Sequence, residues 1–140
     1  MLFRLCFVLL CCFNVQSSFA FKLPIEIIDS MDDSTIIIFA DKDDINQSST
    51  WIPTKGNLPL TIPVMLEKVH AWLGTQEELK NLEVNEIELK KIHNHSKENY
   101  WYYLVQLGGV EKLANKKTHY VAVLMSGKIL SAIKEPKSYK

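Results

Sequence analysis

The sequence contains little cysteine, glycine or proline, and it carries no excess of charge of either sign. Its 140 residues include three Cys, five Gly and five Pro, and 16 Lys and Arg balance 16 Asp and Glu. Balanced charge argues against a general nucleic-acid binder, because such domains are usually basic. Sparse glycine and proline, together with 47% hydrophobic residues, argue against a disordered or fibrous chain. We therefore expect one globular domain and no nucleic-acid partner.

All three cysteines fall within residues 1–20, a segment typical of a secretory signal peptide. Arg4 supplies the positive charge, residues 5–13 form an apolar run, and the small residues Ser18 and Ala20 mark a cleavage site. We expect cleavage after Ala20 and a mature single domain at 21–140, either periplasmic or secreted. That chain then has no disulfide, which favours a bacterial periplasm. No later apolar run is long enough to predict a transmembrane segment.

Hydrophobic periodicity in the mature chain predicts an α+β domain with one main helix. Residues 61–74 carry apolar side chains at spacings of three and four, with Pro63 in the first turn. Alternating or β-branched patterns predict later strands at 84–92, 100–107, 118–125 and 128–133. We expect the helix to pack on an antiparallel meander sheet of about four strands.

The part of the chain before this helix predicts one or two extra N-terminal strands and a long loop. Apolar runs at 25–28 and 35–40 are the strand candidates, and the second is apolar enough to be buried on both faces. Residues 41–60 are polar and interrupted by proline and glycine, which predicts a surface loop. Within this loop we expect Trp51 to fold back onto the core.

Four consecutive aromatic residues, Tyr100, Trp101, Tyr102 and Tyr103, form the most unusual stretch of the sequence. On a strand, Tyr100 and Tyr102 share one face, and Trp101 and Tyr103 share the other. We expect one pair to pack under the helix. The other pair, on an open sheet face, favours binding of a partner protein or an apolar ligand. The alternative is that both pairs are covered.

A His-x-His pair, His93 and His95, is the most metal-like local pattern. On a strand the two rings project to one face, and imidazole is a common ligand of zinc and copper. A stable site needs three or four ligands, which His70 and His119 could complete only through the fold. The alternative is a polar hairpin turn, and we expect no resident metal or other cofactor.

The sequence motifs of common enzyme classes are absent. There is no Gly-x-Ser-x-Gly, phosphate-binding loop, His-Glu-x-x-His or dinucleotide fingerprint. We therefore expect a non-catalytic module that binds or inhibits another exported protein through the aromatic sheet face. The alternatives are a carrier with an apolar pocket between helix and sheet, and a histidine-based metal-handling protein.

Four segments also carry a resemblance to a known family. They are the helix at 62–73, VNEIEL at 84–89, YWYYLV at 100–105 and the closing hairpin HYVAVLMSGKIL at 119–130. In this order, over about residues 61–133, the chain resembles small bacterial periplasmic domains of the PepSY or cystatin-like type. Ser126 stands where that family has an acidic residue before the glycine. The resemblance implies a non-catalytic module that binds or restrains another exported protein, such as a peptidase.

The neutral total charge results from two oppositely charged parts of the mature chain. Residues 21–111 contain eight Lys and fifteen Asp and Glu, whereas residues 112–140 contain seven Lys and one Glu. This distribution predicts either internal pairing between the two parts or a dipole that steers an acidic partner.

Overall fold

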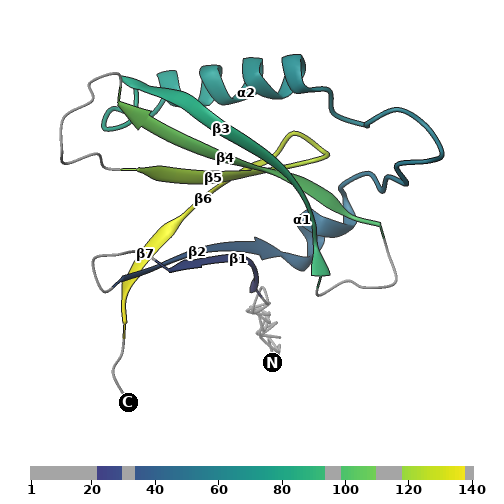
Figure 1. Ribbon diagram of the computed structural model, residues 1–140, viewed down its shortest axis with the longest axis horizontal. Helices are drawn as coiled ribbons and strands as arrows, with labels where there is room; N and C mark the ends of the chain where they lie inside the picture. Colours follow the sequence, from purple (N-terminus) through teal and green to yellow (C-terminus); the bar gives the residue numbers. More distant parts are fainter. Residues whose placement is uncertain (1–21, 30–33, 94–98, 110–117, 138–140) are drawn as a thin grey trace, which may run out of the picture.

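The computed structural model describes residues 22–29, 34–93, 99–109 and 118–137 (Figure 1). The predicted signal peptide and His95 lie outside these residues. In chain order the elements are β1 (Lys22–Asp29), β2 (Ser34–Asp41), α1 (Lys42–Asn46), α2 (Ile62–Gly74), β3 (Leu82–Lys91), β4 (Trp101–Gly109), β5 (His119–Leu124), β6 (Ile129–Ser131) and β7 (Ile133–Pro136). Neither helix of this described part is long and apolar enough to cross a membrane.

The strands form two antiparallel sheets, which confirms the α+β class and the four-stranded sheet. One sheet has the order β3-β4-β5-β6, and the other has the order β1-β2-β7. The predicted N-terminal strands thus build a sheet of their own, completed by the C-terminal strand β7. The sequence predicts one strand at 128–133, but Ala132 separates β6 from β7 and the chain passes there from one sheet to the other.

The predicted helix forms as α2, and its apolar spacing determines its buried side. Thr61 precedes it without a side-chain capping bond, and a proline occupies its first turn, where no N–H is needed. Met65, Val69 and Leu73 are buried at intervals of four residues. They belong to one core cluster with side chains of β4 and β5, namely Tyr103, Val105, Leu107, Val121 and Val123.

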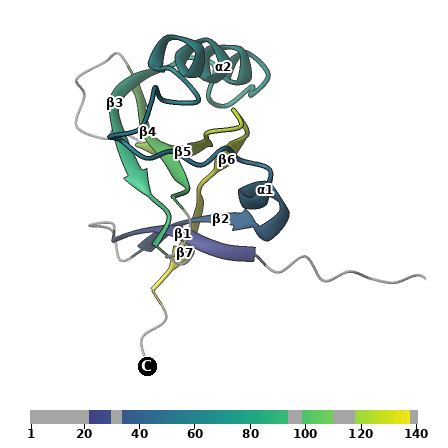
Figure 2. The same cartoon turned by 90° about the vertical axis from the view of Figure 1, so that its right-hand side faces the viewer.

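A second core cluster lies on the other face of the four-stranded sheet. It joins Tyr102 and Leu104 of β4 to Ile38 and Ala40 of β2 and to Ile45 of α1. Figure 2 shows the resulting layers, with α2 on one side of the four-stranded sheet and β1, β2 and β7 on the other. The two central strands are therefore buried on both faces, which explains their almost continuous apolar sequence.

Strand β2 differs from its prediction, because only one of its faces is buried. Ile38 and Ala40 point into the core, whereas Ile37 is only partly buried. Ile37 pairs with Ile27 of β1 and with Ile133 of β7, and these two neighbours are 60% and 46% exposed. The three isoleucines form a row on the outer face of the three-stranded sheet, which we call the outer row.

The segment at 41–60, predicted as a loop, contains the short helix α1 and then runs back to the four-stranded sheet. Trp51 donates its backbone N–H to the carbonyl oxygen of Asn99 at 2.8 Å. Its ring meets Trp101 edge to face, with ring centres 5.3 Å apart. Trp51 thus folds back onto Trp101, which packs against the cluster under α2, but Trp51 itself belongs to neither core cluster.

Candidate functional site

The aromatic residues of β4 do not form an open binding face. Tyr102 and Tyr103 are each 1% exposed, Tyr100 is buried, and Trp101 is half-buried. The Trp101 indole N–H donates to the carbonyl oxygen of Trp51 at 2.9 Å. The expectation of an open aromatic face is therefore wrong, and the alternative, in which both aromatic pairs are covered, is correct. Helix α2 lies over one face of β4, and the three-stranded sheet lies over the other. A partner that approaches the folded domain does not reach the rings of Tyr102 and Tyr103.

The two buried tyrosine hydroxyls tie β4 to neighbouring layers. Tyr103 donates to the carbonyl oxygen of Leu60 at 2.6 Å, just before α2. Tyr102 donates to the carboxylate of Glu26 at 2.6 Å, and Glu26 also forms an ion pair with Lys90 of β3. Burial raises the pKa of both hydroxyls, and for Tyr102 the Glu26 carboxylate raises it further. Both tyrosines therefore stay neutral hydrogen-bond donors.

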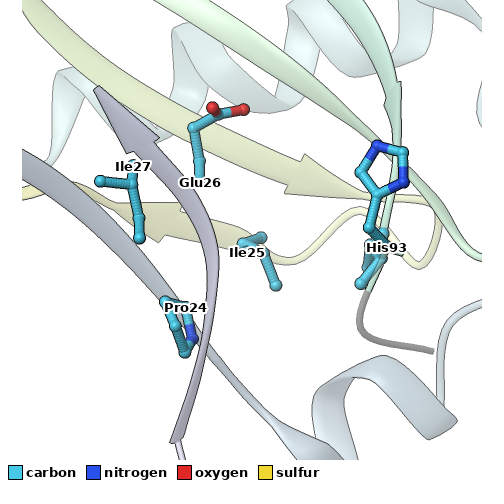
Figure 3. Close-up of a pocket in the computed structure, with 6 residues that line it drawn as sticks. Pro24, Ile25, Glu26, Ile27 and His93 are labelled. Atoms are coloured by element: carbon cyan, nitrogen blue, oxygen red, sulfur yellow. The ribbon is translucent and has the colours of Figure 1, made fainter. Parts of the chain in front are cut away.

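A small pocket of about 160 Å³ lies beside this link between Tyr102 and Glu26 (Figure 3). Residues Pro24–Ile27 of β1 line one side, and Ile92 and His93 line the other. In Figure 3 Glu26 and Ile25 of β1 lie on one side of the pocket, and the His93 ring lies across from them. Within the described residues, no group of three His, Cys, Asp or Glu side chains is placed to hold a metal ion.

The other two described histidines lie away from His93. His119 of β5 stacks on Trp72 of α2, with ring centres 6.5 Å apart, and burial lowers its pKa. His70 is exposed on α2 and lines a groove between α2 and β3. His95 is outside the described residues, so its predicted role with His93 stays a prediction.

A larger groove, with a volume of about 780 Å³, lies between α2 and β3, and we call it the α2–β3 groove. Its apolar side chains are Leu66, Leu73, Leu82 and Val84. The remaining lining residues are Gly74 and the polar His70, Lys80, Asn81 and Glu83. Of the apolar set, only Leu73 is fully buried, so the others present part of their surface to a ligand.

The helix faces explain why the groove opens on the β3 side. Trp72 contacts His119 of β5, and the Lys68 side chain lies next to Gly127 beyond β5, so this flank of α2 covers the sheet. The opposite flank carries Leu66 and His70, which stand over β3. Four residues earlier, Ile62 is 45% exposed and continues the same flank.

The pairing of β3 with β4 shows which side chains of β3 face α2 and which face the opposite side of the sheet. Val84, Ile87 and Leu89 pair with residues of β4 that belong to the cluster under α2. Val84 lines the groove, and Ile87 and the 37% exposed Leu89 lie beyond it on the same face of β3. The acidic residues Glu83, Glu86 and Glu88 lie on the other face, and all three are exposed.

Among the described residues, no strand pairs with the outer edge of β3. Within the described part of the chain, β3 pairs with β4 alone. Strand β1 approaches only near the end of β3, through the ion pair between Glu26 and Lys90. The register shifts between Val84 and Glu86, which places a bulge at Asn85. Along the residues before Lys90, the backbone N–H and C=O groups that point away from β4 have no strand partner among the described residues.

Sequence reasoning predicted a pocket between helix and sheet as an alternative, but it did not identify the lining residues. The alternation of glutamates with Val84, Ile87 and Leu89 is the one signal of an exposed edge strand. No family model, curated protein or solved structure matches the chain.

Proposed function

We propose that the mature chain is an exported, non-catalytic binding module that takes an extended segment of another exported protein into the α2–β3 groove. The observation that carries this proposal is the open edge of β3 beside an apolar groove. Extended peptides bind other domains by adding a strand to such an edge: main-chain hydrogen bonds supply affinity, and pockets for alternate side chains supply specificity.

The dimensions of the groove suit this mode of binding. Strands rise about 3.3 Å per residue and alternate their side chains, so inward-pointing side chains are about 7 Å apart. Leu82 and Val84 line the groove on β3, and Ile87 and Leu89 follow on the same face of the strand. Leu66 of α2 lies opposite them and completes the groove.

The same edge carries features that limit unspecific pairing. Charged side chains and β-bulges on edge strands discourage aggregation through strand addition. Strand β3 has both, in Glu83, Glu86, Glu88 and the bulge at Asn85. A segment that binds here must therefore match the charge and the bend of β3, which favours a specific partner over any free strand.

A carrier of a small apolar ligand is the second candidate. A volume of about 780 Å³ lies within the range of about 300–1,000 Å³ that is typical of small-molecule sites. An apolar floor with His70 and Lys80 at its edge suits an apolar chain with an anionic head group. Peptide and fatty-acid titrations of the same protein separate the two candidates.

The test is a nuclear magnetic resonance titration of the mature, ¹⁵N-labelled protein with a short peptide of alternating leucine and serine. Under the proposal, amide shifts change along β3 and on the Leu66 flank of α2, and the β3 amides exchange more slowly with solvent. Leu66→Glu is expected to abolish these changes. Val64→Glu, at a 43% exposed position of α2 that does not line the groove, is the matched control and retains them.

Two results would contradict the proposal. If peptides leave the β3 amides unchanged while a fatty acid shifts them, the groove belongs to a small-ligand carrier. If both variants lose binding equally, the contact does not lie in the α2–β3 groove.

A further inference from the structure

We infer that the segment bound at β3 alternates apolar with basic side chains, an inference that rests on the proposed function. The groove accounts for the apolar half of this pattern. The basic half follows from the opposite face of β3, which carries the exposed carboxylates of Glu83, Glu86 and Glu88.

Register places these three carboxylates on one side of the sheet. Glu86 pairs with Gln106 and Glu88 with Leu104, and Leu104 belongs to the core on the side of the three-stranded sheet. Glu86 and Glu88 therefore point away from α2 and from the groove, whereas Glu83, at the start of β3, also lines the end of the groove. In the part of the chain that the structure describes, none of them forms an ion pair.

Two lysines at the ends of this stretch of β3 form ion pairs with other residues. Lys90 follows on the same face of β3, but it forms an ion pair with Glu26. Lys80, at the end of the groove, pairs with Glu77 at 3.0 Å. The open part of β3 thus keeps three negative charges on the face that a bound strand would share.

An added strand brings its own side chains next to these carboxylates. Directly opposed residues of neighbouring strands have Cβ atoms about 4.5–5.5 Å apart, so a lysine or arginine reaches a carboxylate across the pair. Glutamate or aspartate at the same positions is repelled. Because side chains alternate along a strand, the positions between the groove-facing apolar residues are those that meet the acidic face.

The size of the expected preference follows from cross-strand charge pairs. Each opposite-charge pair changes the dissociation constant by a factor of about 1.4 to 5. Two or three such pairs together favour a basic over a neutral peptide by about ten-fold. The preference weakens at high salt, because these carboxylates are exposed and screened.

The experiment compares three peptides of equal length with leucine at alternate positions and lysine, serine or glutamate between them. Binding to the mature protein is measured by calorimetry at low and high salt. We expect affinity to fall from the lysine to the serine to the glutamate peptide. Glu86→Gln with Glu88→Gln is expected to reduce this preference strongly while the serine peptide still binds. Glu67→Gln with Glu78→Gln, at exposed positions outside β3, is the matched control and keeps it.

The outcomes separate this inference from the proposed function. Equal affinity for all three peptides would overturn the inference and leave the proposed function standing. If no peptide binds, the proposed function is wrong and the inference falls with it. A lysine preference that survives unchanged in the Glu86→Gln, Glu88→Gln protein would overturn the assignment to β3.

Discussion

The hydroxyl of Tyr102 on β4 donates a 2.6 Å hydrogen bond to the carboxylate of Glu26 on β1. It joins the two sheets, and the same hydroxyl lies 3.2 Å from the carbonyl oxygen of Ile25. The Glu26 side chain is only 11% exposed, and Lys90 of β3 forms an ion pair with it. One carboxylate thus connects β1 with both β3 and β4, at the end of the open β3 edge.

Tyr102→Phe is expected to lower the free energy of unfolding by about 1.5–3 kcal/mol, because it removes a hydrogen bond to a charged group. Tyr103→Phe is the comparison, since Tyr103 is an equally buried residue whose hydroxyl donates to a neutral carbonyl oxygen. Its expected cost is smaller, about 0.5–1.5 kcal/mol. Urea unfolding followed by tryptophan fluorescence measures both. Equal losses would show that the charge on Glu26 adds nothing to the Tyr102 bond.

Strand β2 provides a second test, because two adjacent isoleucines face opposite ways. Ile38 is fully buried between the sheets, and Ile37 belongs to the outer row. Ile38→Ala is expected to destabilise the protein by about 2–5 kcal/mol through lost burial and a new cavity. Ile37→Ala is expected to cost less than half as much, since its site opens to solvent. Similar losses at both positions would mean that another layer covers the outer row.

Gly127, in the turn between β5 and β6, has a φ of 87°, a conformation that disfavours residues with a Cβ atom. Gly127→Ala is therefore expected to cost about 1–2 kcal/mol of unfolding free energy. An added Cβ also lies 2.6 Å from the Lys68 side chain, whose flexible end can move. Gly74→Ala is the control. Gly74 is the last residue of α2, and a Cβ atom added there meets no atom within 4 Å. We therefore expect Gly74→Ala to stabilise the protein by up to about 1 kcal/mol. Thermal unfolding followed by circular dichroism measures both variants, and a stability loss at Gly74 would contradict the argument.

The elements that the sequence predicted are those with a local pattern. Helix α2 has its apolar spacing of four and its early proline, and β3, β4 and β5 follow period-two or continuously apolar runs. The second sheet depends instead on Ile37 pairing with Ile133, nearly a hundred residues later. No local pattern contains that pairing, so the break at Ala132 and the outer row could not be predicted.

The candidate site was misplaced for a related reason. Tyrosine is an amphipathic residue type, but the sequence does not show which layers of the fold cover Tyr102 and Tyr103. Their burial results from α2 on one face and from β1 and β2 on the other, which are distant in sequence. The groove arises because α2 packs toward β5 and leaves Leu66 over β3. That lateral position depends on Trp72 and His119 and has no sequence motif.

His119 gives the final prediction, a loss of stability in mild acid. Its ring stacks on Trp72, its Nε2 lies 3.1 Å from the Ser131 hydroxyl, and burial lowers its pKa below the ordinary value of 6.5. The unfolded chain therefore binds a proton more readily than the folded chain. The stability that His119 contributes is complete above about pH 6.5 and declines as the pH falls from there to the lowered pKa of the folded state.

His119→Gln keeps a polar partner for Ser131 and replaces the imidazole, which binds a proton in mild acid, with an amide, which does not. We expect the parent protein to lose more unfolding free energy between pH 7.5 and pH 5 than this variant does, in matched urea series. His70→Gln, at an exposed position on the opposite flank of α2, is the control. Because His119 holds the β5 flank of α2, protonation is also expected to loosen the helix on the sheet. If the parent and the His119→Gln variant lose stability equally over this range, the imidazole is not buried in the folded state.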